Sequence, residues 1–375
     1  MQTEFRKIAD EKNLRGKRVL LRLDLNVPIV NGEVRDDFRV KRSLDTIRFL
    51  RDAGAKTIIM SHIEDEIVTS LSRVAAYMQR FVTIKALVSD LKDAEGVVRT
   101  MNEGEVIMLE NLRRDPGEKG NNPMFAARLA ALGDVYVNDA FAVSHREHAS
   151  VVSVPRMIPS YAGLLLAEEV AQLSRAFNPS HPFVFLLGGA KFETKLPLIE
   201  KFLGIADSVF VGGALANDLF KEKGFEIGKS LISKAHGNLR HVEMNPRLMV
   251  PIDVVIGSAS AKAVKDADSV DKDDRILDAG PRTIGELSDV LSEAQFALWN
   301  GPLGDYEIGF SEGTEGLARA LVESGVPTII GGGDTIAVVS KLGLLDKFSF
   351  VSTGGGAMLQ FLADGTLPGI EALKS

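Results

Sequence analysis

The sequence of 375 residues contains no cysteine, only one tryptophan and 6% aromatic residues in all. The lack of cysteine excludes disulfides, thiol nucleophiles and thiolate metal ligands. No apolar run approaches the roughly 20 residues of a membrane span, and the N-terminal M-Q-T-E-F-R-K lacks the apolar core of a signal peptide. A net charge of -7 argues against a broad nucleic-acid surface, although not against a small basic pocket. We therefore expect a cytoplasmic protein that binds neither membranes nor nucleic acid.

Several motifs of well-known nucleotide enzymes are also missing. No G-x-G-x-x-G follows a predicted strand, which leaves a nicotinamide-dependent dehydrogenase unsupported. Neither H-R-D nor D-F-G is present, so a protein kinase is not indicated. The segment 224–230, G-F-E-I-G-K-S, resembles a Walker A loop but has three residues between its glycines where that motif has four. It also follows no predicted strand, and we reject it as a phosphate loop.

Short apolar runs alternate with amphipathic stretches along the chain. The runs are apolar on both faces, which is typical of parallel strands covered by helices. This alternation predicts βαβ units and an α/β fold with two mostly parallel sheets, each with helices on both faces. The predicted strands are 19–25, 57–60, 106–109, 135–138, 183–188, 208–212, 249–256, 296–299, 328–331 and 348–352. The predicted helices include 40–53, 123–132 and 314–324.

A helix with one broad apolar face is predicted between the two series of strands. It covers residues 162–177, and the prolines of N-P-S-H-P at 178–182 end it because proline cannot continue a helix. A chain of this length exceeds one ordinary domain. We expect an N-terminal domain over residues 1–161, a connecting helix over 162–177 and a C-terminal domain over 178–363.

Polar and cationic residues follow the predicted strands of the N-terminal domain. Ligands of open α/β sheets bind beyond the carboxyl ends of the strands. Asp24 and Asn26 follow the first strand, His62 follows the second, and Arg113 lies just beyond the third. The segment 138–150, N-D-A-F-A-V-S-H-R-E-H-A-S, follows the fourth. The pattern predicts an anion site at this rim, with a solvated charged loop as the alternative for the last segment.

The segment 138–150 holds His145, Arg146 and His148 within four positions, although the chain has only 6 histidines. Two histidines three residues apart suggest a metal site. Without cysteine or an evident third ligand, however, hydrogen-bonded structural roles are the better interpretation. Arg146 is the residue of this segment that we expect to contact a ligand.

Glycine-rich turns follow the predicted strands of the C-terminal domain. Glycine at a strand-to-helix turn lets backbone N–H groups approach phosphate oxygens, which the helix N-terminus also favours. One such turn could serve only a tight bend, whereas several on one rim, with Lys191 and Lys195 beside them, predict a phosphate site. The turns are 188–191, 212–213, 300–302, 331–335 and 353–356.

Taken together, these motifs resemble those of the phosphoglycerate kinase family over nearly the whole chain. They are R-L-D-L-N-V-P at 22–28, D-D-F-R-V at 36–40, E-N-L-R at 110–113, N-D-A-F at 138–141, S-H-R-E-H-A-S at 144–150, G-G-A-K at 188–191, W-N-G-P-L-G at 299–304, G-G-G-D-T at 331–335, S-T-G-G-G-A at 352–357 and L-P-G-I-E-A-L at 367–373. The resemblance implies two Rossmann-like domains joined by a hinge helix, with the tail 364–375 packed onto the first domain. It also implies a monomer that transfers a phosphoryl group from 1,3-bisphosphoglycerate to ADP with Mg²⁺, giving 3-phosphoglycerate and ATP.

The matching positions imply which residues form the two sites. The phosphoglycerate site is expected to comprise Asp24, Asn26, Arg39, His62, Arg113 and Arg146. The nucleotide site is expected to comprise Lys191, Lys195, Gly212, Gly213, Asn300, Pro302, Glu307, Gly331, Gly332, Gly333, Asp334 and Thr335. Asp334 is expected to hold the metal, and the catalytic residues are expected to be Arg39, Lys191, Gly332 and Gly355. Asn300 could instead be a turn residue, and Arg22 is expected to form an ion pair rather than touch substrate.

One segment departs from the family pattern. Where the family commonly reads S-H-L-G-R-P, residues 61–66 read S-H-I-E-D-E, so Asp65 stands in place of an arginine and two further acids flank it. Acids that face a phosphate pocket should weaken substrate binding. The acidic loop could instead point to solvent, or Arg35 or Arg73 could supply the missing charge. The alternative function is therefore a nucleotide-binding relative with weakened or lost transfer activity.

Overall fold

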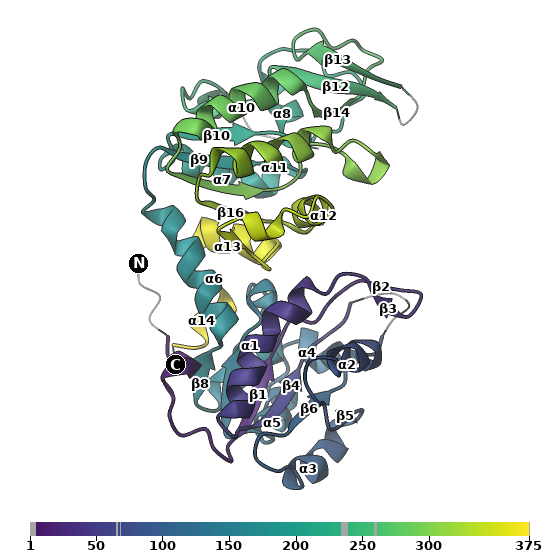
Figure 1. The fold of residues 1–375 in the computed structure, drawn as a ribbon, viewed down its shortest axis with the longest axis vertical. Helices are drawn as coiled ribbons and strands as arrows, with labels where there is room; N and C mark the ends of the chain where they lie inside the picture. Colours follow the sequence, from purple (N-terminus) through teal and green to yellow (C-terminus); the bar gives the residue numbers. More distant parts are fainter. Residues whose placement is uncertain (1–4, 65–66, 68, 234–238, 259–260, 375) are drawn as a thin grey trace. The chain divides into compact units, whose positions relative to one another are not determined.

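The computed structural model describes residues 5–64, 67, 69–233, 239–258 and 261–374 (Figure 1). The chain divides into two compact units. Unit 1 comprises Met1–Ala171 and Asp364–Ser375, and unit 2 comprises Gln172–Ala363. In the described part of the chain no helix combines the length and the apolar character needed to cross a membrane.

Unit 1 is built on a six-stranded parallel sheet with the strand order β5-β6-β4-β1-β7-β8. Its central strands are almost wholly buried, because helices cover both faces. The strands are β1 (Arg18–Arg22), β4 (Lys56–Met60), β5 (Leu87–Val88), β6 (Val106–Leu109), β7 (Val135–Asn138) and β8 (Ser160–Ala162), with a separate hairpin of β2 (Ile29–Val30) and β3 (Glu33–Val34). The helices are α1 (Phe38–Asp52), α2 (Ser72–Met78), α3 (Leu91–Arg99), α4 (Pro116–Lys119), α5 (Pro123–Ala130) and α14 (Pro368–Glu371).

The C-terminal tail belongs to unit 1, where it packs against the segment after β7. The Gly369 N–H donates to the Ser144 carbonyl at 2.8 Å, and the Asn138 side chain donates back to the Gly369 carbonyl at 3.4 Å. A Cβ on Gly369 would lie only 2.7 Å from Val151 Cγ1, so this close approach requires glycine. The tail therefore packs directly against the segment after β7 and is bonded to the end of that strand.

Unit 2 repeats the architecture with the parallel order β11-β10-β9-β15-β16-β17 and adds a three-stranded antiparallel sheet, β13-β12-β14. The strands are β9 (Phe183–Leu187), β10 (Ser208–Val211), β11 (Leu248–Met249), β12 (Asp253–Ser258), β13 (Ala261–Asp266), β14 (Ile276–Ala279), β15 (Phe296–Asn300), β16 (Thr328–Gly331) and β17 (Phe350–Val351). The helices are α6 (Leu164–Ser174), which spans the boundary between the units, α7 (Phe192–Leu203), α8 (Ala214–Glu222), α9 (Arg240–Glu243), α10 (Pro281–Glu293), α11 (Glu312–Ser324), α12 (Gly333–Lys341) and α13 (Gly356–Asp364).

Several sequence-based boundaries differ from the structure. The predicted strand 249–256 is two strands in different sheets, β11 and β12, because Pro251 between them cannot donate to a sheet ladder. The predicted strand 19–25 ends at Arg22, which leaves Leu23 to Leu25 in the loop that carries Asp24. The predicted helix 162–177 begins at Leu164 and ends in a 3-10 turn, since Ala162 closes strand β8.

Candidate functional site

The carboxyl ends of β1, β4, β6 and β7 meet at one edge of the unit 1 sheet, here called the unit 1 rim. Asp24, two residues beyond β1, is almost buried and forms an ion pair of 3.1 Å with Arg39 on the first turn of α1. Arg39 also donates to the Asn26 carbonyl at 2.9 Å. Three of the residues predicted for the acid substrate are therefore brought together, although they come from two different elements.

His62 joins this cluster from the end of β4. Its Nε2 lies 4.0 Å from the Asp24 carboxylate, and its Nδ1 faces the Arg22 guanidinium at 3.3 Å. Burial, followed by the nearby charges of Arg22 and Arg113, holds the pKa of His62 well below its usual value. Because a guanidinium can only donate, Nδ1 accepts and the neutral ring carries its proton on Nε2. His62 is thus a neutral hydrogen-bond donor beside Asp24.

Arg22 lies beneath the rim and is fully buried, as is its counter-ion Glu118 at 3.9 Å. Ser150 joins the two, accepting from Arg22 at 2.8 Å and donating to Glu118 at 2.5 Å. The prediction that Arg22 forms an ion pair is confirmed. This buried network links β1, α4 and the segment after β7. Through Arg22 it also contacts the ring of His62.

Arg113 stands at the end of β6 in a 3-10 turn capped by Asn111, whose side chain accepts from the Arg113 N–H at 3.1 Å. Its guanidinium is nearly buried, and it contacts the carboxylate of Glu64. Desolvation lowers the pKa of Arg113, which the Glu64 carboxylate opposes. The predicted substrate residue Arg113 therefore has an internal anion as its partner. Asp65 and Glu66, the other acids of the departure, lie outside the described residues.

Arg146 is exposed, and within the described part of the chain no ion pair engages it. The neighbouring histidines are half-buried, and desolvation lowers the pKa of His145 to about 4 and also lowers that of His148. The Nδ1 atoms of both have no hydrogen-bond partner among the described residues. The part of the chain that the structure describes contains no group of three or more His, Cys, Asp or Glu side chains that could bind a metal.

The carboxyl ends of β9, β10, β15, β16 and β17 form a corresponding unit 2 rim. Four helices begin within a few residues of these strand ends, namely α7, α8, α12 and α13. Their N-terminal N–H groups and dipoles favour an anion. Gly332, with φ of 98°, precedes α12, and Gly355, with φ of 49°, precedes α13.

Some glycines of this rim are required by close packing between turns. The Gly189 N–H donates to the Pro302 carbonyl at 2.8 Å, and a Cβ on Gly301 would lie 2.3 Å from the Gly188 carbonyl oxygen. Gly213 has φ of 62°, and a Cβ there would meet the Gly189 nitrogen at 2.6 Å. By contrast, Gly333 has open space around it. The glycines thus serve two purposes. Some allow neighbouring turns to pack closely, and others leave the backbone accessible.

Two lysines lie at this rim, Lys191 as the N-cap of α7 and Lys195 within the helix. Lys191 is exposed and has φ of 64°, a left-handed conformation that costs a non-glycine residue about 1–2 kcal/mol. Lys195 is partly buried and donates to the Gly188 carbonyl at 2.7 Å. Burial lowers the pKa of Lys195 to about 8, although the charge of Asp334 opposes the shift. Backbone strain and a perturbed pKa at one helix end are features of functional sites.

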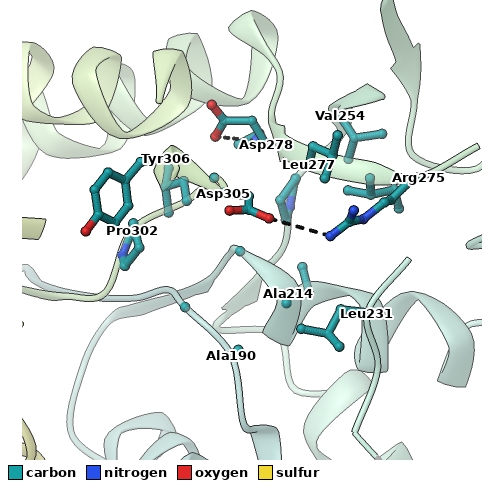
Figure 2. A pocket seen from close by; sticks show the side chains of 18 of the residues that line it. Ala190, Ala214, Leu231, Val254, Arg275, Leu277, Asp278, Pro302, Asp305 and Tyr306 are labelled. Carbon is teal, nitrogen blue, oxygen red and sulfur yellow. Dashed lines mark hydrogen bonds and ion pairs between the residues drawn. The ribbon is translucent and has the colours of Figure 1, made fainter. Parts of the chain in front are cut away.

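A cavity of about 260 Å³ opens beside these turns (Figure 2). Four of the predicted nucleotide residues line it: Gly213, Pro302, Glu307 and Asp334. Lys191 lines a neighbouring cavity with Ala190 and Ala214. The other predicted residues lie in the strand ends, turns and helices of the rim: Lys195, Gly212, Asn300, Gly331, Gly332, Gly333, Thr335 and Gly355. Asn300 is buried against Met358 and Thr335 accepts from the Gly301 N–H at 3.0 Å, so both stabilise the turn.

Sequence reasoning missed one wall of this cavity. Arg275 and Asp305 form an ion pair of 3.5 Å there, next to apolar Leu231 and Leu277, as Figure 2 shows. Burial raises the pKa of Asp278, another lining residue, to about 6. Asp305 directly follows the W-N-G-P-L-G motif, which was a usable signal. Arg275 and Asp278 come from the antiparallel sheet and the segment before it, which no motif marked.

Asp334 is the carboxylate of this rim best placed for a cation. It lies on the first turn of α12 and lines the cavity, with the Tyr306 hydroxyl 3.5 Å away. Mg²⁺ is usually bound by one or two carboxylates together with substrate phosphates. One carboxylate beside helix N-termini, which favour anions, fits such a shared site.

Two α/β units, one with a cationic rim and one with glycine-rich turns, define the class as an α/β enzyme acting on anionic ligands. The phosphoglycerate kinase family model matches residues 9–365. The phosphoglycerate kinases of Roseiflexus castenholzii and Rubrobacter xylanophilus are each 41% identical, with 96% of both chains covered. The solved phosphoglycerate kinase of Coxiella burnetii is 38% identical with a TM-score of 0.86, covering 99% of both chains. That of Pyrococcus horikoshii is 30% identical with a TM-score of 0.87, covering 98%.

The chain therefore belongs to the phosphoglycerate kinase family. Its function is that of a glycolytic kinase, which is a transferase, and the family uses ADP or ATP together with a metal. The predicted fold of two α/β units with mostly parallel sheets is confirmed. The comparisons give no support to the alternative of a nucleotide-binding relative that has lost transfer activity.

Proposed function

We propose that this enzyme reversibly transfers a phosphoryl group from 1,3-bisphosphoglycerate to ADP, giving 3-phosphoglycerate and ATP. The observation that carries the proposal is the convergence of Asp24, Arg39 and His62 at the unit 1 rim. In this proposal residues 1–161 with the tail 364–375 form the phosphoglycerate-binding domain, 162–177 the connecting helix and 178–363 the nucleotide-binding domain.

At the unit 1 rim the acid substrate is bound by six side chains with distinct roles. The arginines grip carboxylate and phosphate oxygens, because a planar guanidinium can donate to them in pairs. His62 donates from Nε2, while Asp24 and Asn26 bind the substrate hydroxyl. The proposed set is Asp24, Asn26, Arg39, His62, Arg113 and Arg146.

At the unit 2 rim the nucleotide phosphates are bound by lysines, backbone N–H groups and one metal ion. Lys191, Lys195 and the N-termini of α7 and α12 supply positive potential, which supports this assignment. Glu307 accepts from the ribose hydroxyls, and Asp334 holds Mg²⁺ together with the phosphates. The proposed set is Lys191, Lys195, Gly212, Gly213, Asn300, Pro302, Glu307, Gly331, Gly332, Gly333, Asp334 and Thr335.

The proposed reaction needs no general base. In the direction of ATP consumption the acceptor is the carboxylate of 3-phosphoglycerate, which is already ionised at neutral pH. Catalysis then consists of positioning the reactants and stabilising charge on the transferring phosphoryl group. We assign that stabilisation to Arg39, Lys191 and the backbone N–H groups at Gly332 and Gly355.

A coupled assay of ATP formation from 1,3-bisphosphoglycerate and ADP tests the proposal directly. Turnover that requires Mg²⁺ supports it, whereas no turnover at millimolar substrate with ADP still bound would refute it. We further propose that the protein is a cytoplasmic monomer that binds no nucleic acid, in keeping with the small-molecule substrates of a glycolytic family. Light scattering after gel filtration at micromolar concentration tests the monomer.

Lys195 should make nucleotide binding depend on pH. Its ammonium form binds phosphate, and the bound anion raises the lowered pKa of about 8 again. Affinity is therefore full below pH 8 and falls as the pH rises above it. By pH 9 the Kd for ADP should be about tenfold higher than at pH 7. Calorimetric titration at several pH values measures this.

Arginine stays protonated across this range, so the variant Lys195→Arg should bind ADP with a nearly constant Kd. The exposed Lys223, on the same unit, offers a matched control, because Lys223→Arg should retain the dependence of the unaltered enzyme. A Kd for ADP that stays constant between pH 7 and pH 9 in the unaltered enzyme would contradict the proposal that Lys195 binds the nucleotide phosphates.

A further inference from the structure

Glu64 is an anion at the unit 1 rim that the proposed function does not use. Its carboxylate contacts Arg113 and accepts from Lys119, at the end of α4, at 2.8 Å. Ion pairing with Lys119 and Arg113 keeps the pKa of Glu64 below its usual value, so the carboxylate is ionised at neutral pH. An ionised carboxylate thus bridges two cations at the rim proposed to bind an anionic substrate.

The backbone around Glu64 is held in place by residues of the same rim. The Glu64 N–H donates to the Asn26 side chain at 3.0 Å. One residue earlier, the Ile63 N–H donates to Asn111 at 3.3 Å, and Asn111 donates back to the Ile63 carbonyl at 2.9 Å. These bonds direct the Glu64 side chain towards Arg113, because Asn111 also caps the turn that carries Arg113.

Arg113 depends on this partner. Its side chain is only 7% exposed, whereas that of Glu64 is 56% exposed. The Nε of Arg113 is buried without a hydrogen-bond partner among the described residues. A nearly buried guanidinium requires an anion, and Glu64 supplies one that solvent can reach and a ligand can displace.

We propose that Glu64 is an internal competitor of the acid substrate, occupying on Arg113 and Lys119 the position that a substrate phosphate or carboxylate takes when bound. The proposal rests on the proposed function and adds Lys119 as a second cation of the same subsite. It makes residue 64 a determinant of substrate affinity, since 3-phosphoglycerate binds only after the Glu64 carboxylate has moved away.

The competing interpretation is that Glu64 orients Arg113 for the substrate, and it predicts the opposite sign. If Glu64 orients Arg113, neutralising it loosens the guanidinium and weakens binding. If Glu64 competes, neutralising it leaves the cations available and strengthens binding. Glutamine has nearly the shape of glutamate without its charge, so Glu64→Gln separates the two.

The test is calorimetric titration of the full-length protein with 3-phosphoglycerate in the absence of nucleotide. We expect Glu64→Gln to lower the Kd about three- to tenfold, because an exposed ion pair is partly screened. The Kd for ADP should stay unchanged, and under turnover the KM for 3-phosphoglycerate should fall while kcat changes less than about twofold. An unchanged or higher Kd for 3-phosphoglycerate would overturn the proposal.

Glu103→Gln is the matched control, because it removes the same charge from unit 1. Glu103 pairs with Arg15 at 3.1 Å and precedes β6, whereas the rim follows the strand. An equal gain in affinity for 3-phosphoglycerate in this variant would show that the effect comes from net charge alone, and it would overturn the proposal. An unaltered protein that binds 3-phosphoglycerate without turnover would refute the proposed function alone. No binding by either the unaltered protein or Glu64→Gln would refute both.

Discussion

Replacing Arg39 with methionine should lower kcat/KM by about 100- to 1000-fold, the usual effect of removing one group that stabilises charge in a transition state. Arg39 is the cation of the unit 1 rim that Asp24 and the Asn26 carbonyl hold in position, at 3.1 and 2.9 Å. A fixed guanidinium needs no reorganisation when charge develops on the transferring group. Methionine keeps much of the length of the side chain and removes only its charge and its donors.

Steady-state kinetics with varied 3-phosphoglycerate and ATP measure the effect. Arg48→Met is the matched control, because Arg48 lies on the same helix, α1, and pairs only at the surface with Asp45. Its kcat/KM should stay within about twofold of the unaltered enzyme, since exposed ion pairs contribute little. A loss of less than tenfold in Arg39→Met would show that Arg39 binds no reacting group. Unchanged ADP affinity would exclude a general loss of structure.

Glu118→Ala should destabilise unit 1 by about 3–5 kcal/mol, because it leaves the charge of Arg22 buried without a counter-ion. Both side chains are fully buried. Glu118 also accepts from the Ser150 N–H at 2.9 Å and from its hydroxyl, so the substitution removes acceptors of the segment after β7 as well. No other ion pair described in this unit is buried on both sides to the same degree.

Hydrogen exchange in urea, followed on peptides of unit 1, measures this loss. The only tryptophan, Trp299, lies in unit 2, so its fluorescence does not report on unit 1. Glu95→Ala breaks the exposed pair with Arg99 and should cost less than about 0.5 kcal/mol. Arg22→Met added to Glu118→Ala should restore part of the stability, since the unpaired charge is then removed. Equal effects of Glu95→Ala and Glu118→Ala would contradict the buried-charge argument.

Local pattern was sufficient for the sheet strands that lie beside the two rims. The apolar run at Val106–Leu109 is buried on both faces and the polar residues after it end the strand, so both the element and its rim were predictable. The strand β13, Ala261–Asp266, was not. Its side chains are largely exposed and its sequence A-K-A-V-K-D lacks an apolar run, because antiparallel pairing with β12 rather than burial defines it.

The candidate sites also contain residues that the sequence identified and contacts that it did not. Residue type and position relative to a strand end identified Asp24, His62 and Lys191, because an α/β sheet presents its strand ends at one rim whatever the details of packing. Arg39, on the first turn of α1, was identified only through the resemblance to the family. The contact of Glu64 with Arg113 joins residues 49 positions apart, and the sequence left open whether the acidic loop faced the pocket or solvent. The Arg275–Asp305 pair of the unit 2 cavity is similarly non-local.

Periodicity thus determined the fold class, since it depends on local backbone preference. The resemblance of the motifs to those of the family then implied most of the proposed ligand residues by matching position. Only the tertiary structure decided which charges are buried and which partner each one has. Burial sets the pKa of His62 and Lys195, and packing between distant loops sets Glu64 against Arg113. These pKa values and this contact depend on the water that folding removes and on the charges that folding brings close together. No local sequence pattern encodes either.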